Sequence, residues 1–310
     1  MGRPRHVLEF EFSKEEVKEI LDLADRLKAD RRLGVLGGGL EKRSVALIFE
    51  KPSTRTRVSF EVAIWELGGN SIFLSSNELQ LSRGEAIKDT ARVLSRYVDA
   101  VVARVLRHES IVEFAKYSSV PVINALSDLY HPCQILADLQ TIREYKRGLE
   151  GLKIAWIGDG TNVCNTMLLA SSLMGMDMWV ACPKGYEPYE GAIKRARELA
   201  GESGSRIEIT TNPLEAVEDA DVVMTDTFVS MGKEAEREER LRAFMPDYQV
   251  NEELMKHAKE DAIFMHCLPA RRGEEVTDEV IDGPRSAVWD EAENRLHTEK
   301  ALLLYLLSKS

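Results

Sequence analysis

The chain has 310 residues, of which 44% are hydrophobic and 30% charged, a composition typical of a globular protein with more than one domain. Its 52 acidic and 41 basic residues give a net charge of −11, which argues against a general nucleic-acid-binding protein, since such proteins carry a basic face. The amino terminus has no long apolar stretch, so we expect neither a signal peptide nor a membrane span and favour a cytoplasmic location. The four cysteines have neither the density nor the spacing of a disulfide scaffold, and we expect free thiols: Cys133, Cys164, Cys182 and Cys267.

The first half of the chain alternates predicted helices and strands. Ser13 and Glu16 form a capping-box signature at the start of a helix. A second helical pattern, in which Val58, Val62 and Trp65 share one face, ends at Gly68-Gly69, and a third covers residues 89–97. Apolar runs predict strands at residues 45–49, 71–74, 100–104 and 120–124. Such alternation predicts βαβ units around a parallel sheet.

A second α/β series follows the polar stretch at residues 146–151. Its predicted strands lie at residues 153–157, 178–181, 206–209, 222–224 and 263–265. We therefore expect an α/β protein of two similar domains, each a parallel sheet flanked by helices. The predicted domains are residues 1–148 and 149–289, with residues 290–310 packing back onto the first. The charge run from Glu234 to Arg242 is expected to be a solvated helix face.

The segment 53–57, with the sequence Ser-Thr-Arg-Thr-Arg, lies between the first predicted strand and the helix that follows it. The first-turn N–H groups of a helix lack intrahelical partners, and the helix dipole is positive there. Hydroxyls add donors, and a guanidinium matches phosphate oxygens. A capping serine followed by solvated arginines is the alternative, but a cap needs one hydroxyl and this segment has three. The segment therefore predicts an anion site.

Polar residues also follow the other predicted strands. The carboxyl ends of parallel strands meet at one edge of a sheet, which is where ligands of open α/β sheets bind. The polar sets at these ends are Arg104, His131-Pro132-Cys133-Gln134, Gly158-Asp159-Gly160-Thr161-Asn162, Asp226 with Ser230-Met231-Gly232, and His266-Cys267-Leu268-Pro269, and Arg295 stands before the last helix.

Two cofactor hypotheses fit these residues poorly. Gly158-Asp159-Gly160 suggests a dinucleotide site, but Val163 stands where the third glycine of that pattern belongs, and no carboxylate follows the next strand. A zinc site of His131, Cys133, His266 and Cys267 matches no common structural spacing. We therefore expect no cofactor and no metal.

Taken together, these motifs resemble the aspartate/ornithine carbamoyltransferase family, and within it the ornithine-using branch. The likeness covers nearly the whole chain, to Asn294-Arg295-Leu296-His297. Segments 53–57 and 131–134 look like the family's carbamoyl phosphate site. Asp226 with residues 230–232, and segment 266–269, are similar to its ornithine-binding signatures. Thr161-Asn162 departs from the two asparagines of many members, so we assign the ligand role to Asn162, with Asn165 as the alternative.

The resemblance implies transfer of the carbamoyl group of carbamoyl phosphate to the δ-amine of L-ornithine, giving L-citrulline and phosphate. Arg104, His131 and Cys267 are then the catalytic residues, with Cys267 either a proton acceptor or only an orienting group. Ornithine would be held by Asn162, Asp226, Ser230 and Met231. Carbamoyl phosphate would be held by Ser53, Thr54, Arg55, Thr56, Gln80, Arg104, His131, Pro132, Cys133, Gln134, Cys267, Leu268 and Arg295.

The family also implies a homotrimer or an assembly of trimers. In such an assembly the loop of residues 79–84, which contains Gln80, reaches into the active site of a neighbouring subunit. The resemblance further implies that the second domain closes over the bound amino acid. Putrescine or acetylornithine as acceptor, and a non-catalytic anion-binding relative, remain alternatives.

Overall fold

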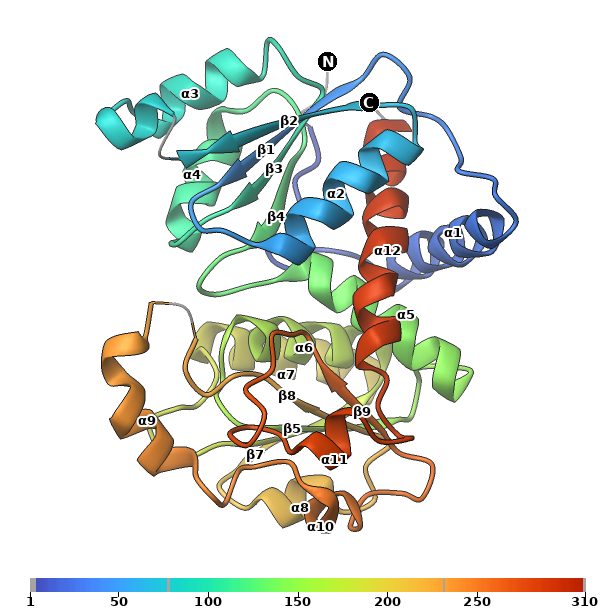
Figure 1. Cartoon of the computed structure of the whole chain (residues 1–310), viewed down its shortest axis with the longest axis vertical. Helices are drawn as coiled ribbons and strands as arrows, with labels where there is room; N and C mark the ends of the chain where they lie inside the picture. Colours follow the sequence, from blue (N-terminus) through green and yellow to red (C-terminus); the bar gives the residue numbers. More distant parts are fainter. Residues whose placement is uncertain (1–3, 77–78, 231, 309–310) are drawn as a thin grey trace. The chain divides into compact units, whose positions relative to one another are not determined.

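The computed structural model describes residues 4–76, 79–230 and 232–308. The chain divides into two compact units (Figure 1). The first contains the chain up to Gln140 and the segment from Glu293 onward, and the second is Thr141–Ala292. Within the described residues, no helix is both long enough and apolar enough to cross a membrane.

The first unit is built on a four-stranded parallel sheet with the strand order β2-β1-β3-β4. Helices α3 and α4 cover one face, and α1, α2 and α12 lie on the other (Figure 1). Its elements are α1 (Lys14–Arg32), β1 (Ser44–Phe49), α2 (Thr54–Glu66), β2 (Asn70–Ser75), the 3-10 helix η2 (Gln80–Arg83), α3 (Ile87–Leu94), β3 (Ala100–Arg104), α4 (His108–Tyr117), β4 (Val122–Leu126), the start of α5 (Pro132–Lys146) and most of α12 (Val288–Ser308).

Local sequence signals set the first helix and the strands. The Ser13 hydroxyl accepts a hydrogen bond from the Glu16 N–H, and the Glu16 carboxylate accepts one from the Ser13 N–H, so the predicted capping box is confirmed. The central strands β1 and β3 are almost entirely buried, as apolar runs in a parallel sheet covered on both faces should be. The predicted fourth strand is two residues early, because β4 begins at Val122, after Pro121.

Helix α2 packs with a different face from the one that the apolar pattern emphasises. Val58 and Trp65 are 51% and 68% exposed, whereas Phe60, Ala63 and Ile64 are buried. The helix carries two apolar stripes, and contact with the sheet selects only one of them. The sequence pattern alone contains no information on that choice.

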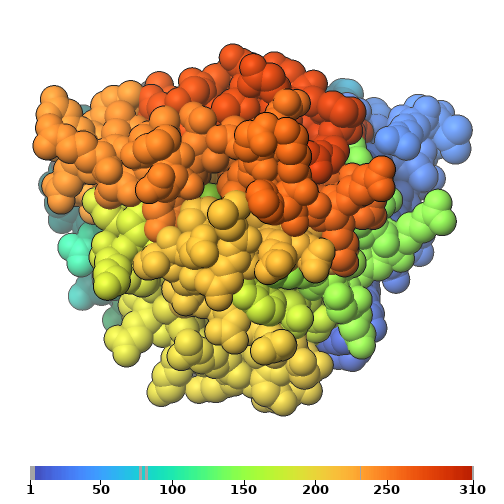
Figure 2. Space-filling view, turned by 90° about the horizontal axis from the view of Figure 1, so that it is seen from below, coloured from blue at the N-terminus to red at the C-terminus, as the bar shows by residue number. Residues whose placement is uncertain are grey.

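The second unit is a five-stranded parallel sheet with the order β7-β6-β5-β8-β9. Helices α6 and α7 pack on one face, and α8 and α10 on the other (Figure 1). The chain from α7 to α10, yellow to orange, forms much of the face seen in Figure 2. Its elements are β5 (Lys153–Ile157), α6 (Asn162–Met174), β6 (Asp177–Ala181), α7 (Glu190–Ser203), β7 (Ile207–Thr210), α8 (Pro213–Val217), β8 (Val222–Thr225), the 3-10 helix η3 (Glu234–Glu236), α9 (Arg237–Phe244), α10 (Glu252–Met255), β9 (Ile263–His266) and α11 (Asp278–Ile281).

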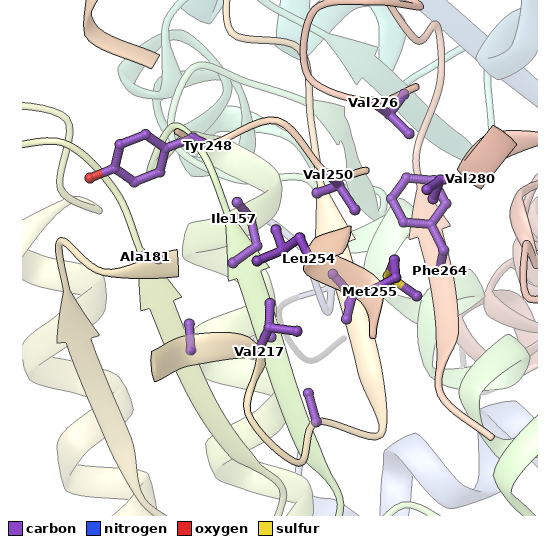
Figure 3. Packing of buried hydrophobic residues seen from close by; sticks show 14 of the residues in the cluster. Ile157, Ala181, Val217, Tyr248, Val250, Leu254, Met255, Phe264, Val276 and Val280 are labelled. Atoms are coloured by element: carbon purple, nitrogen blue, oxygen red, sulfur yellow. The ribbon is translucent and has the colours of Figure 1, made fainter. Parts of the chain in front are cut away.

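The core of the second unit joins its sheet to the helices of one face. Ile157 and Phe264 come from the sheet, and Val217, Leu254 and Met255 come from α8 and α10 (Figure 3). The rings of Phe228 and Phe244 stack with centroids 4.6 Å apart, which fixes the loop after β8 against α9. The predicted fold class, two parallel sheets flanked by helices with the last helix returning to the first unit, is confirmed.

Candidate functional site

The segment 53–57 begins α2 at the carboxyl end of β1. Ser53 is the N-cap, and its hydroxyl accepts a 3.4 Å hydrogen bond from the Thr56 N–H. Arg57 forms an ion pair of 3.0 Å with Glu61 and lies 3.6 Å from the centroid of the Phe73 ring. The Arg57 side chain thus forms its contacts with α2 and β2, and Arg55 remains the candidate for binding the anion.

Burial and three nearby guanidinium groups lower the pKa of His131. This residue is buried directly before α5, at the carboxyl end of the sheet. Burial, together with the positive charges of Arg295, Arg104 and Arg55, holds the pKa of His131 well below its usual value. The imidazole is therefore neutral at pH 7 and carries a single N–H, so it can donate one hydrogen bond without adding charge to the site.

Arg295 lies within α12 rather than before the last helix as predicted, and it joins the residues predicted to surround the carbamoyl group. Its Nη1 donates a 2.8 Å hydrogen bond to Gln134 Oε1, and its Nη2 lies 3.5 Å from Thr56 Oγ1. Gln134 Nε2 in turn donates to Asp138 at 2.8 Å. All four side chains are buried. This chain of contacts fixes the Gln134 amide, with Oε1 turned to the guanidinium and Nε2 to the carboxylate.

The remaining residues predicted for this site differ in their surroundings. The Cys133 thiol donates to the Asn124 carbonyl at 3.4 Å, and burial raises its pKa far above the ordinary value. Cys133 is therefore no nucleophile, and the group it can offer is its N–H in the first turn of α5, next to Pro132. Gln80 is exposed on η2, and Thr54 is exposed in the first turn of α2.

In the second unit, the loop after β5 forms a tight turn that starts α6. Gly158 has φ +129°, and a Cβ on Gly160 would lie 2.2 Å from the Pro188 nitrogen, so both positions require glycine. Asn162 is the first residue of α6. The Asn165 side-chain oxygen accepts a 2.9 Å hydrogen bond from the Tyr189 N–H, a contact that favours Asn162 as the residue facing a ligand.

Asp226 and Cys267 meet at the carboxyl ends of β8 and β9. Burial raises the pKa of Asp226, although His266, the Thr227 N–H and a hydrogen bond from Cys267 oppose the rise. The Thr227 N–H donates to Asp226 at 2.7 Å. Candidate ligand atoms of Asp226, His266 and Cys267 lie within 4.8 Å of one another. The thiol thus has a carboxylate as its immediate partner.

His266 holds the loop that carries Cys267. The Leu268 N–H donates to His266 Nδ1 at 2.8 Å, so Nδ1 is the acceptor and Nε2 carries the proton toward Glu275 Oε1, 3.1 Å away. Leu268 has φ +56°, a conformation that residues other than glycine rarely adopt. Since both ring nitrogens of His266 are occupied, its role is to shape the loop rather than to bind a metal.

Two further residues predicted to bind ornithine, Ser230 and Met231, follow Asp226 in the sequence. Ser230 is half-buried, and its carbonyl accepts a 3.0 Å hydrogen bond from the Lys233 N–H. Met231 lies outside the described residues. The charge run that follows is mostly exposed, as predicted, with one exception: Arg240 is buried and ion-paired with Asp159.

Sequence reasoning missed three buried charged residues that support the site: Arg240, Glu275 and Glu299. Each lies among or near other charged residues in the sequence, where a solvated side chain is the usual outcome. The only available signal was the spacing of Glu299, which is four residues after Arg295 and therefore on the same helix face.

Comparison with known proteins places this chain in one family. Residues 5–144 match the family model for the carbamoyl-P binding domain of aspartate/ornithine carbamoyltransferase, and residues 150–306 match the model for its Asp/Orn binding domain. The chain belongs to the aspartate/ornithine carbamoyltransferase family.

The relatives to which it is most similar include proteins of the ornithine branch. It is 55% identical to the ornithine carbamoyltransferase of Archaeoglobus fulgidus over 98% of both chains. The solved structure of ornithine carbamoyltransferase from Pyrococcus furiosus matches with a TM-score of 0.94 and 52% identity, covering 99% of this chain and 98% of that one. The anabolic enzyme from Campylobacter jejuni matches with a TM-score of 0.93 and 45% identity, covering 99% and 100%.

Proposed function

We propose that this protein transfers the carbamoyl group of carbamoyl phosphate to the δ-amine of L-ornithine and releases L-citrulline and phosphate, a step of arginine metabolism. The observation that carries the proposal is the convergence of Arg55, Arg104 and Arg295 on a buried neutral His131, beside the Gln134 amide. Relatives over 50% identical that are named ornithine carbamoyltransferase support the same reaction.

The phosphate of the donor would bind at the start of α2. Its two negative charges need local positive charge in a protein of net charge −11, and Arg55 with the α2 N-terminus supplies it. Ser53, Thr54 and Thr56 would add hydroxyl and N–H donors. Gln80 would contribute from a neighbouring subunit of a homotrimer or larger assembly, as the family resemblance implies.

The carbamoyl group would lie against His131, Arg104 and Arg295. Negative charge grows on its oxygen as the amine attacks, and donors already in place stabilise that charge without reorganising. A neutral His131 donates one hydrogen bond there, and Gln134 would accept from the carbamoyl NH2 group. Losing one such donor typically slows a reaction by about 10²–10³-fold. Pro132 and Cys133, in the first turn of α5, would also bind the donor, and the family resemblance assigns Cys267 and Leu268 to the same substrate.

The acceptor must lose a proton before it reacts. An alkylamine with a pKa of about 10.4 is the free base in only about one molecule in 10³ near pH 7, a deficit of about 4–5 kcal/mol. Cys267 lies hydrogen-bonded to Asp226, and it would accept that proton as a thiolate or, as a thiol, would only orient the amine. Asn162 and the Met231 N–H would hold the α-carboxylate, and Asp226 and Ser230 the α-ammonium group.

In this proposal each of the two units binds one substrate. The first unit would bind carbamoyl phosphate and the second ornithine, as the descriptions of the two matched family models suggest. The domain boundaries at residues 148 and 289 and the cytoplasmic location remain predictions of the same kind. In this proposal Asp226 disfavours acetylornithine, which lacks the α-ammonium group, and the carboxylate contacts of Asn162 and Met231 disfavour putrescine, which lacks the carboxylate.

One assay tests the proposal. The purified protein is given carbamoyl phosphate with ornithine, aspartate, putrescine or acetylornithine in separate reactions, and the carbamoylated product and phosphate are measured. We expect citrulline and phosphate in equal amounts with ornithine alone. Equal turnover with another amine, or phosphate release that does not depend on the amine, would contradict the proposal.

A further inference from the structure

Glu299 is a buried carboxylate one helical turn beyond Arg295. Its side chain is 1% exposed, and its Oε1 accepts hydrogen bonds from Arg295 Nε at 3.0 Å and Arg295 Nη2 at 2.7 Å. A single oxygen therefore binds one whole edge of the guanidinium. Because the guanidinium is planar, holding this edge fixes the direction in which the adjacent Nη1–Nη2 edge points.

The Nη1–Nη2 edge of the guanidinium, which shares Nη2 with the edge bound by Glu299, faces the donor site. Arg295 Nη1 donates to Gln134 Oε1 at 2.8 Å, and Nη2 lies 3.5 Å from Thr56 Oγ1. Without Glu299, the Nε and Nη2 hydrogens would need other acceptors, and the guanidinium could turn toward them. The orientation of Arg295 relative to Gln134 thus depends on a residue that is not itself among those predicted to bind carbamoyl phosphate.

A gain in folding stability does not by itself explain the buried ion pair of Glu299 and Arg295. A buried ion pair is often no better for folding than apolar residues of the same size, because both charges lose their hydration. Burial raises the pKa of Glu299 to about 7, even though Arg295 and Ser59 oppose the rise, so the carboxylate is costly to keep charged. A group retained at such a cost points to a role in the site.

A second ion pair on α12 offers a comparison. Lys300 Nζ donates to Glu66 Oε2 at 2.9 Å, and both side chains are buried. The other partners of this pair are the Leu36 carbonyl and Arg31, none of which belongs to the predicted site. The two pairs have similar burial and chemistry, and only one of them contacts a site residue.

We propose that Glu299 is a positioning residue for carbamoyl phosphate, which acts by holding the Arg295 guanidinium in register with Gln134 and Thr56. The inference rests on the proposed function, since it assigns Arg295 to the carbamoyl pocket. It predicts an effect on one substrate only, because the contacts of Glu299 and Arg295 that define the role all lie in the first unit.

The test compares Glu299→Gln with the matched control Glu66→Gln in steady-state kinetics with both substrates varied. Glutamine keeps the shape but loses the charge and one strong acceptor, so we expect the carbamoyl phosphate KM to rise about 10-fold, as for a weakened charge-assisted hydrogen bond. The ornithine KM should change less than about 2-fold. Glu66→Gln should lower the melting temperature and leave both KM values as in the parent.

A third variant, Glu299→Asp, covers the case in which Glu299→Gln does not fold. Aspartate keeps the charge but withdraws the oxygen from the guanidinium, and the carbamoyl phosphate KM should again rise. An unchanged carbamoyl phosphate KM in the folded variant, or an equal rise for both substrates, would overturn the positioning role. Failure of the parent protein to make citrulline would instead refute the proposed function, so the two failures are distinguishable.

Discussion

Arg240 forms a buried ion pair with Asp159, 81 residues earlier in the chain, and its Nε donates a 2.6 Å hydrogen bond to the Phe228 carbonyl. One side chain thus ties the loop after β5 to the loop after β8. These are the loops that present Asn162 and Asp226, so the geometry of the predicted ornithine site depends on a residue that is not among those predicted to bind ornithine.

Replacing Arg240 with methionine should destabilise the protein and weaken ornithine binding. The change leaves the Asp159 carboxylate buried and unpaired, which costs about 3–5 kcal/mol of unfolding free energy. We expect a lower urea midpoint and a higher ornithine KM, with the carbamoyl phosphate KM unchanged. The control is Arg237→Met, which removes an exposed ion pair with Glu274 and should leave the urea midpoint close to that of the parent. Equal effects of the two variants would contradict this role for Arg240.

The two arginines of the segment 53–57 should respond differently to truncation. Arg55 acts on His131, whereas Arg57 is held by Glu61 and Phe73. Arg55→Ala should raise the carbamoyl phosphate KM by about 10- to 100-fold, the scale of one lost charge-assisted contact, and Arg57→Ala should change it by less than about 3-fold. An effect of Arg57→Ala as large as that of Arg55→Ala would show that the anion site is wider than proposed.

The framework of the fold was predictable because its signals are local. The strands at 100–104 and 153–157 coincide with β3 and β5, since short apolar runs bounded by polar residues leave little choice in a parallel sheet. The packed face of α2 was not predictable, because Val58 and Phe60 lie on different apolar stripes and only tertiary contact selects one of them.

The residues of the site were likewise predictable only in part. Arg104 and His131 follow predicted strands, and the topology of the sheet brings such residues to one edge. The supporting residues Glu275 and Glu299 gave no such signal, because a charged side chain on a helix or loop is normally solvated and only the assembled fold buries it. The different surroundings of Arg55 and Arg57 likewise depend in part on His131 and on the Phe73 ring in β2, which local sequence does not place beside them.

The thiol of Cys267 should matter for the chemical step. In Cys267→Ser the hydroxyl keeps a hydrogen bond to Asp226 but titrates far above neutral pH, so a proton acceptor would be lost. We expect kcat to fall about 10²-fold, within the range for general base catalysis, and the pH dependence of kcat to shift. The control is Cys182→Ala, which removes a thiol whose pKa burial raises to about 12. A modest fall in kcat with an unchanged pH profile would assign Cys267 to orientation alone.

Glu16 should make the stability of the protein depend on pH in the acid range. Burial by itself would raise the pKa of Glu16, but the Ser13 N–H, the Tyr305 hydroxyl and Arg5 outweigh it and hold the pKa at about 2. A carboxyl whose pKa is lower in the folded than in the unfolded chain stabilises the fold above its ordinary pKa of about 4.5, and this contribution disappears as the pH falls toward 2.

Glu16→Gln should therefore lower the free energy of unfolding by about 1–2 kcal/mol at pH 7, a figure reduced from the full pKa shift because the side chain is partly exposed. The difference from the parent should be unchanged at pH 6 and should shrink steadily between pH 5 and pH 3, as measured by urea unfolding at each pH. Glu15→Gln, an exposed change in the same helical turn, should stay within about 0.5 kcal/mol of the parent. A difference for Glu16→Gln that stays constant down to pH 3 would mean that lost packing, rather than the carboxylate charge, accounts for the effect.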